Sequence, residues 1–164
     1  MNFKLRKAKK DDLIQTFELF NDSLVRQNSF SKEQVSLNEH KIWFNDKLND
    51  KDCIFYIAET LDNKFIGQVR FDKQDSNNKS FIINISISSL YRNKGFGSTI
   101  LQEVSKLVSN ENKEYSIYAY IKKDNIVSVK SFAKAKYTII SEEIINGSPC
   151  YYLKFKGELN ENKQ

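Results

Sequence analysis

The feature that most restricts the fold of this chain is a strand-like segment that runs into a glycine-containing loop and then into a helix. Residues 81–88 place apolar side chains on one face and side chains that become polar toward the end on the other, which predicts a strand. After the loop 91–97, apolar side chains recur at helical spacing, and we expect the helix to begin at about Ser98. This arrangement brings a helix N-terminus to the end of a strand.

The loop itself has the composition of an anion-binding turn. Gly95 and Gly97 let main-chain N–H groups approach an anion closely, and the N-terminus of the following helix stabilises negative charge. Arg92 and Lys94 add positive charge. A Gly-x-Gly turn before a helix is also common as plain turn chemistry, and this one lacks the remaining spacing of a Rossmann or Walker loop. The order of the surrounding elements has to decide between the two interpretations.

The rest of the sequence predicts further helices and strands around this loop. Apolar alternation at Phe3 and Leu5 indicates a first strand, whereas the segment 21–31 has no clean period. Three strands separated by turn residues are expected to form an antiparallel meander. The expected elements are helices at 13–20, from a capping box at Ser36 through Leu48, and at 125–135, strands at 53–59, 65–72, 81–88 and 115–121, turns at Asp62-Asn63 and 76–78, and a closing hairpin at Asn146-Gly147.

The length bounds the number of domains. A chain of 164 residues fits one compact domain, since domains cluster around roughly 100 to 200 residues. We expect a single domain at residues 1–157. The polar end, residues 158–164, is expected to be a flexible tail.

This order of elements resembles the GNAT superfamily of acetyl-CoA-dependent N-acetyltransferases over almost the whole chain. The resemblance rests on the Arg-x-x-Gly-x-Gly loop at 92–97, which follows two helices and a meander and precedes a strand, an Asn-capped helix and a hairpin. It implies an α/β (α+β) fold with a mixed, mostly antiparallel twisted sheet of about six or seven strands and about four flanking helices. A splayed strand pair in that sheet would hold acetyl-CoA.

The resemblance also implies which residues hold the coenzyme. In the family the loop amides bind the pyrophosphate, the strand before the loop pairs through its backbone with the pantetheine amides, and a later helix adds contacts. The corresponding positions are Ile85, Ser86 and Ile87 in the strand, Arg92, Asn93, Lys94, Gly95, Phe96, Gly97 and Ser98 in the loop, and Asn125, Ser128 and Phe132 in the later helix. Acetyl-CoA is therefore the expected cosubstrate.

The later helix departs from the family pattern. The family often carries a tyrosine seven residues after the helix Asn, where it protonates the departing thiolate, and this chain has Phe132 there. The coenzyme A thiol is acidic enough to leave partly unaided, so we expect transfer to persist. Tyr91 and Tyr137 are candidate substitutes for the acid, and packing in the core is the alternative for each.

A closer resemblance concerns the acceptor. The segments 21–29, 40–44 and 66–72 are similar to the nucleotide-sugar N-acetyltransferases, a branch that includes the pseudaminic acid pathway. This implies a nucleotide-linked amino sugar, of the UDP-4-amino sugar type, as the acceptor. Arg26 would pair with the diphosphate and Trp43 would offer a flat face to a ring, with a surface charge and a core position as the respective alternatives. The acceptor-binding set is Arg26, Ser29, His40, Trp43 and Arg70.

The proton of the acceptor amine has several candidate routes. No carboxylate lies in the strand before the loop to act as the common family base, which favours His40, the single histidine, with a reference pKa of about 6.5. Glu39, Asp72 and a water chain held by Asn84 or Ser86 are the rival routes. Backbone N–H groups of the strand are expected to stabilise the oxyanion. The candidate catalytic residues are His40, Tyr91 and Ser86.

The composition narrows the partners and the compartment. The net charge of +5 comes from Lys and Arg scattered among 21 acidic residues, which is typical of a solvated surface and argues against nucleic-acid binding. No apolar stretch reaches the roughly 20 residues that span a bilayer, and no signal peptide is indicated. Cys53 and Cys150 indicate neither a disulfide framework nor a metal cluster. We expect a cytoplasmic monomer or homodimer without a metal or a membrane contact.

Two other functions stay open at this point. A GNAT fold also permits acetylation of a protein N-terminus, a lysine or a small amine such as an antibiotic, because the loop does not distinguish acceptors. A catalytically silent coenzyme-binding module is the alternative from a different class, and the missing tyrosine keeps it open.

Overall fold

The computed structural model describes residues 2–74 and 79–157, which form one seven-stranded sheet with five α-helices. The sheet order is β1-β2-β3-β4-β5-β7-β6, and every neighbouring pair is antiparallel except β4 and β5. This is the mixed α/β sheet that the sequence predicted. The strands are β1 (Lys4–Lys7), β2 (Cys53–Glu59), β3 (Phe65–Lys73), β4 (Ser80–Ile87), β5 (Ser116–Lys122), β6 (Tyr137–Ile145) and β7 (Ser148–Phe155), and the helices are α1 (Leu13–Phe20), α2 (Ser23–Asn28), α3 (Leu37–Asn49), α4 (Phe96–Glu111) and α5 (Ile126–Lys134).

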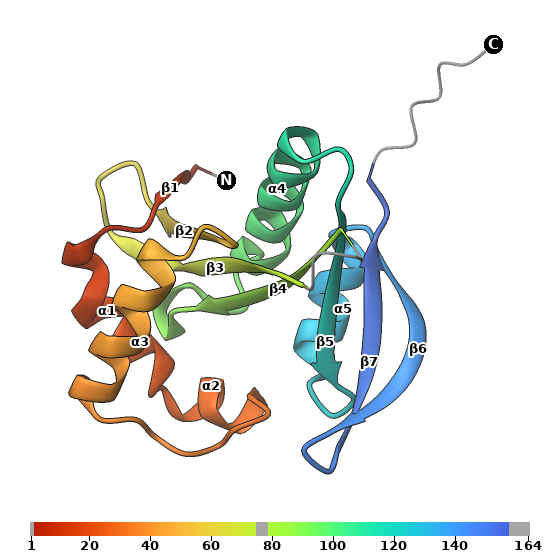
Figure 1. The fold of residues 1–164 in the computed structure, drawn as a ribbon, viewed down its shortest axis with the longest axis horizontal. Helices are drawn as coiled ribbons and strands as arrows, with labels where there is room; N and C mark the ends of the chain where they lie inside the picture. Colours follow the sequence, from red (N-terminus) through yellow and green to blue (C-terminus); the bar gives the residue numbers. More distant parts are fainter. Residues whose placement is uncertain (1, 75–78, 158–164) are drawn as a thin grey trace.

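The helices divide between the two faces of the sheet (Figure 1). α1 and α3 lie on one face, over β2 and β3, and α4 and α5 lie on the other. The larger core lies between the sheet and the α4–α5 layer, while Phe44 of α3 packs with Phe55 and Ile57 of β2 in a smaller core. Full burial of one such side chain contributes about 1.5–3 kcal/mol. The α4 side chains in the larger core recur at helical spacing and are Ile100, Leu101, Val104 and Val108.

Local sequence signals account for several boundaries. α3 begins after Ser36, whose hydroxyl accepts the Glu39 N–H at 3.2 Å while the Glu39 carboxylate accepts the Ser36 N–H at 2.7 Å. Asn125 caps α5, and Asn146 and Gly147 both take positive φ angles, 47° and 74°, in the β6–β7 turn. A two-residue turn with positive φ at both positions matches the twist of the flanking strands. The predicted capping box and hairpin are confirmed.

Two predictions of local structure need correction. α4 begins at Phe96 rather than at about Ser98, so Gly97 and Ser98 lie in its first turn. The segment without a clean period contains α2, a six-residue helix that Asp22 caps by accepting the N–H groups of Leu24 and Val25, each at 3.1 Å. The predicted turn at 76–78 and the predicted tail at 158–164 lie outside the described residues.

β4 and β5 separate soon after they pair. Their parallel ladder has three registered pairs, which end at Ile82 and Tyr118, although β4 continues to Ile87 and β5 to Lys122. Figure 1 shows the two strands diverging toward their C-terminal ends. The splayed strand pair expected from the sequence is therefore present, in the middle of the sheet.

Among residues 2–74 and 79–157, no helix combines the length and the apolar composition that crossing a bilayer requires.

The close approach of β3 to the end of β4 depends on Gly67. A Cβ atom at Gly67 would lie 2.3 Å from the carbonyl oxygen of Ser86 and 3.1 Å from the Cα of Ile87. Both of these contacts are with the backbone, which cannot rotate away. We therefore predict that Gly67→Ala lowers the free energy of unfolding by about 1–3 kcal/mol and weakens coenzyme binding, because it displaces the strand beside the gap.

Gly97→Ala is the matched control for this prediction. A Cβ atom there would meet Ile87 Cγ1 at an ordinary 3.7 Å, and alanine favours a helix over glycine by about 1 kcal/mol. Urea titrations of both variants compare the two sites. Equal stability of Gly67→Ala and the wild type would contradict the proposed constraint.

Candidate active site

The main-chain groups of β4 alternate between its two neighbours, and every second residue faces the gap. Ser80 O accepts the N–H of Gln74, and Ser88 N donates to Ile66 O, each at 2.8 Å, so the even-numbered residues bond toward β3. Strand geometry then turns the N–H and C=O groups of Ile83, Ile85 and Ile87 toward β5, where the ladder has ended. The edge of β4 that faces the gap thus carries main-chain donors and acceptors outside the β4–β5 ladder. Ile85 and Ile87 are among these positions, and their pairing with the pantetheine amides stays a prediction. Ser86 bonds toward β3 and offers the gap no main-chain group.

The loop after β4 has the backbone shape of an anion-binding turn. Asn93 and Gly95 both adopt left-handed conformations, with φ of 59° and 83°. Such turns orient successive N–H groups toward one point, and the first N–H groups of α4 have no acceptor within the helix. Gly97 has room for a Cβ atom, which would meet only Ile87 Cγ1 at 3.7 Å. Ser98 Oγ donates to Gly95 O at 3.2 Å and closes the turn from within.

Arg92 has a different role from the simple positive charge that the sequence suggested. Its Nε donates to Ile87 O at 2.8 Å, and its Nη2 donates to Asp22 Oδ1 at 2.8 Å. Lys94 likewise donates to a main-chain carbonyl, that of Leu90, at 2.7 Å. Arg92 therefore joins the end of β4 to the start of α2. Its hydrogen bond to Ile87 O also provides a donor for one of the carbonyls that face the gap.

The predicted residues of α5 lie on the helix that follows β5 and that shares one face of the sheet with α4. Asn125 Oδ1 accepts the Ser128 N–H at 3.2 Å, which uses its oxygen as the helix cap. Ser128 is half-buried, and Phe132 is buried with its ring edge-on to Tyr137, 4.9 Å between centroids. α5 thus presents a cap and a packed apolar surface.

These features match a known family. The model of the acetyltransferase (GNAT) domain matches residues 2–138. The chain belongs to the GNAT acetyltransferases. It is an acetyl-CoA-dependent N-acetyltransferase of the GNAT type, and the gap, the turn and the helix N-terminus are suited to the pantetheine arm and pyrophosphate of its cosubstrate.

Individual relatives are more distant. An N-alpha-acetyltransferase of Saccharolobus solfataricus is 23% identical over 146 residues, covering 83% of this chain and 80% of the relative. The spermidine N-acetyltransferase of Vibrio cholerae, solved with CoA and spermine, is similar with a TM-score of 0.85 at 18% identity, covering 94% of this chain and 95% of that one. AAC(6')-Ib, solved with ribostamycin and coenzyme A, gives a TM-score of 0.83 at 16% identity, with coverages of 99% and 100%. These structures share the fold.

The candidate acids differ in their surroundings. The Tyr137 hydroxyl shares a 2.7 Å hydrogen bond with Ser105 Oγ, and burial raises the pKa of Tyr137 above its ordinary value. A fully packed tyrosine cannot approach a departing thiolate, so Tyr137 has the structural role that was its alternative. Tyr91 is half-buried, with its ring edge-on to Phe96 at 5.4 Å between centroids. Of the two substitutes, Tyr91 stays a candidate.

Arg26 and Ser29 do not have the roles predicted for them. Arg26 is only 7% exposed and donates to the carbonyls of Phe20 (2.6 Å), Ser31 (3.0 Å) and Glu33 (3.4 Å) and to Ser29 Oγ (3.0 Å). Ser29 Oγ donates in turn to Val25 O at 2.7 Å. Because these donors serve the chain itself, Arg26 orders the segment around α2 and is not placed to pair with a diphosphate.

His40 is also turned inward. It is 1% exposed, its Nε2 lies 3.2 Å from Thr16 Oγ1, and burial lowers its pKa to about 4. Its Nδ1 has no partner among the described residues. A group enclosed in this way does not meet an acceptor amine, so the catalytic role expected for His40 is not supported by its position. The rings around it are those of Phe17, Phe20, Trp43 and Phe44.

Trp43 and Arg70 form a packed pair. The Arg70 guanidinium lies 4.9 Å from the centre of the Trp43 ring, and its Nε donates to Asp72 Oδ2 at 2.7 Å. Lys47 donates to the other Asp72 oxygen, also at 2.7 Å. The Trp43 face offered to a sugar in the prediction is therefore covered by Arg70. Asp72, paired with two cations that help hold its pKa low despite burial, is a poor base.

Two features beside the gap, on the face of the sheet that carries α1 and α3, were not predicted. Gln68 lies opposite Ser86 in the β3–β4 ladder, is 7% exposed, and its Oε1 has no partner among the described residues. Tyr152 of β7 stacks on Tyr118 and Tyr120 of β5, with centroids 5.0 Å and 4.6 Å apart. The alternating tyrosines at 118 and 120 were the sequence signal for this row. Burial and then the charge of Glu143 raise the pKa of Tyr120 above its ordinary value.

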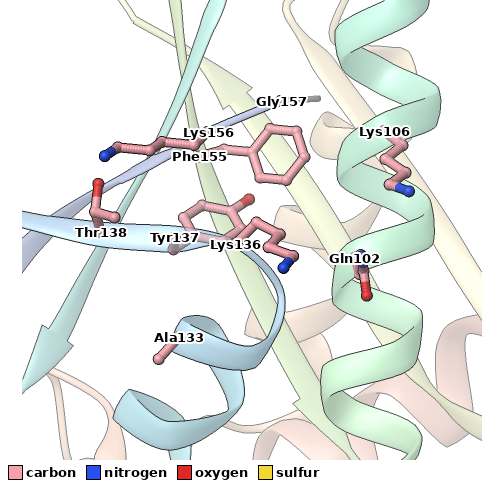
Figure 2. Close-up of a pocket in the computed structure, with 9 residues that line it drawn as sticks. All are labelled: Gln102, Lys106, Ala133, Lys136, Tyr137, Thr138, Phe155, Lys156 and Gly157. Carbon is pink, nitrogen blue, oxygen red and sulfur yellow. The ribbon is translucent and has the colours of Figure 1, made fainter. Parts of the chain in front are cut away.

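A separate cavity of about 360 Å³ lies near the C-terminal end of α5 (Figure 2). Figure 2 shows Gln102 and Lys106 of α4 on one side and Lys136 on the other. None of the predicted site residues except Tyr137, which was a candidate acid, lines it. The cavity is therefore distinct from the gap between β4 and β5.

We predict that Gly97→Glu abolishes coenzyme binding without unfolding the chain. The side chain brings a negative charge to the phosphate position, which should weaken binding by at least about 2 kcal/mol, whereas an acid in the first turn of α4 is favourable to the helix. Calorimetric titration with acetyl-CoA measures the loss. Gly97→Gln is the uncharged control of similar size, and unchanged affinity in Gly97→Glu would remove the loop from the coenzyme site.

A second prediction uses the buried imidazole. Unfolded His40 titrates near 6.5 and the folded group near 4, so between these values the unfolded chain binds the proton and the folded chain does not. The free energy of unfolding should therefore decrease as the pH drops from about 6.5 to 4. In His40→Phe this decrease should be smaller by about 2 kcal/mol.

Urea titrations of both proteins at several pH values between 4 and 7 give the comparison. The hydroxyl of Thr16, which also donates to Asp12 O at 2.9 Å, keeps a partner in the variant. Parallel pH profiles of the wild type and His40→Phe would show that the imidazole titrates normally in the folded protein.

Proposed function

We propose that the chain acetylates a primary amine of a small molecule by direct transfer, with the amine approaching from the face of the sheet that carries α1 and α3. The observation that carries this proposal is the widening gap between β4 and β5, faced by the main-chain groups of Ile85 and Ile87 and ending at the α4 N-terminus. Where two strands of a sheet separate, substrates bound on its opposite faces can meet between them. The coenzyme side is the face of α4 and α5.

The chemistry needs little from side chains. The coenzyme supplies an acetyl thioester: the amine nitrogen forms a bond to the carbonyl carbon, the C–S bond breaks, the amine loses a proton and the sulfur gains one. A main-chain N–H of Ile85 or Ile87 stabilises the charge that develops on the carbonyl oxygen. Because Phe132 has no hydroxyl, the sulfur takes its proton from water or from Tyr91.

The position of each candidate base favours a water-mediated route for the amine proton. His40 is enclosed, Asp72 is paired with two cations, and the Glu39 carboxylate is engaged at the start of α3. Ser86 and Gln68, which face each other across the β3–β4 ladder, are placed to hold water beside the gap. We assign them a positioning role, with the proton passing to solvent.

The prediction of a nucleotide-linked amino sugar depended chiefly on a contact between Arg26 and the diphosphate, and the position of Arg26 does not support that contact. Arg26 has its guanidinium engaged with main-chain carbonyls, and Trp43 is covered by Arg70. Similar structures hold spermine and ribostamycin beside coenzyme A, which supports a small amine acceptor in general. We therefore propose the small amine without the nucleotide. The cytoplasmic location that the two free thiols favour, and the oligomeric state, stay predictions.

Release of free thiol from acetyl-CoA tests the proposal against a panel of amines. We expect turnover with at least one of spermidine, aminoglycosides or simple alkyl amines, and less with a peptide N-terminus. A UDP-linked amino sugar and the same sugar without its nucleotide form the matched pair, and a strong preference for the UDP form would restore the nucleotide. Tight coenzyme binding with no turnover on any amine would favour the silent module.

A further inference from the structure

Lys122 is a buried cation that pairs with no carboxylate within residues 2–74 and 79–157. It is the last residue of β5 and is 4% exposed, and no ion pair involves it among the described residues. Its Nζ donates to Gln27 O at 3.0 Å and lies 5.9 Å from the centre of the Phe30 ring. Burying an ammonium group is costly unless its interactions repay the lost hydration. The burial of Lys122 therefore has to be offset, and its hydrogen bond to the carbonyl of Gln27 contributes to this.

Gln27 lies in the last turn of α2, whose carbonyls carry the negative end of the helix dipole. The other end of α2 is held by the Asp22–Arg92 ion pair, and Arg92 also bonds the carbonyl of Ile87, the last residue of β4. α2 is thus fastened to the ends of both diverging strands. Figure 1 shows α2 between the left part of the molecule and β5.

The length of α2 matches this bridging position. Asp22 and Gln27 are five residues apart, which corresponds to about 7.5 Å along a helix, compared with about 4.8 Å between paired strands. Both ends of α2 are held, so the helix connects the ends of two strands that no longer pair. Releasing one end would let α2 move relative to the other strand, on the face where we propose that the acceptor approaches.

We propose that Lys122 is a positioning residue that holds α2 across the open end of the gap and so limits the size of the acceptor. This rests on the proposed function for the side of approach, although the anchoring itself does not. Lys122 acts through α2 and does not contact the reacting atoms. Arg92 holds the other end of α2 through Asp22. Because Arg92 belongs to the loop at 92–97, the position of α2 is coupled to that loop.

Kinetics with two amines of different bulk test the limit. Propylamine and tryptamine are assayed by thiol release at saturating acetyl-CoA, and we expect Lys122→Met to raise the ratio of kcat/KM for tryptamine over propylamine by about three- to tenfold, the size of an ordinary net hydrogen bond. Lys122→Arg should return the ratio toward the wild-type value. Lys123→Met is the matched control, because the neighbouring Lys123 pairs with Glu142 on the surface.

Hydrogen exchange tests the anchoring without any turnover. Exchange of the amides at 23–30 should be faster in Lys122→Met than in the wild type and Lys123→Met. If Lys122→Met fails to fold, Asp22→Asn, which keeps a helix cap but loses the charge opposite Arg92, should shift exchange and the amine ratio in the same direction.

The outcomes separate the two proposals. Unchanged exchange at 23–30 in a folded Lys122→Met protein overturns the anchoring, and faster exchange with an unchanged amine ratio overturns the limit on acceptor size. Absence of turnover in the wild type on any amine overturns the proposed function instead, and exchange then decides the anchoring alone.

Discussion

The loss of main-chain pairing between β4 and β5 beyond Ile82 and Tyr118 is the constraint from which the rest of the site follows. A main-chain group left without a partner in a buried place costs about 1–3 kcal/mol, so strands separate inside a sheet only where other contacts hold them. Gly67 lets β3 hold the end of β4 closely, and Arg92 takes the carbonyl of Ile87. α2 then joins the two separated ends. The separation of β4 and β5 is therefore stabilised by specific contacts of the fold.

The sequence predicted those elements whose signals are local. Strand β2 was placed at its observed bounds, because an apolar run between turn residues needs no distant information. The cap at Ser36 and the turn at Asn146-Gly147 are likewise set by neighbouring residues. α2 was missed for the opposite reason: it has only six residues, and one of its anchors, Asp22–Arg92, joins positions 70 residues apart. Short helices are marginal without tertiary contacts, so their sequences carry little periodicity.

The roles predicted for the acceptor-binding residues are not supported, because the sequence did not indicate the direction of their side chains. Arg26, His40, Trp43 and Arg70 do gather in one part of the molecule, around Phe20 and the smaller core. A sequence cannot show that the main-chain carbonyls at 20, 31 and 33 converge on Arg26, because their directions depend on how the whole segment folds. Arg26 resembles a substrate-binding residue in the sequence, but in the structure it donates its hydrogen bonds to the chain itself.

The difference between the two halves of the site has a physical origin. The proposed coenzyme half consists mainly of main-chain groups: the gap-facing edge of β4, the left-handed turn at Asn93 and Gly95, and the first turn of α4. Such groups are fixed by the fold, and solved structures with 16–18% identity share this fold. The proposed acceptor half depends on side chains, including the tyrosine row, and on the anchoring of one short helix. Side chains can change without loss of the fold, which is why the coenzyme could be inferred from one loop while the acceptor requires the structure.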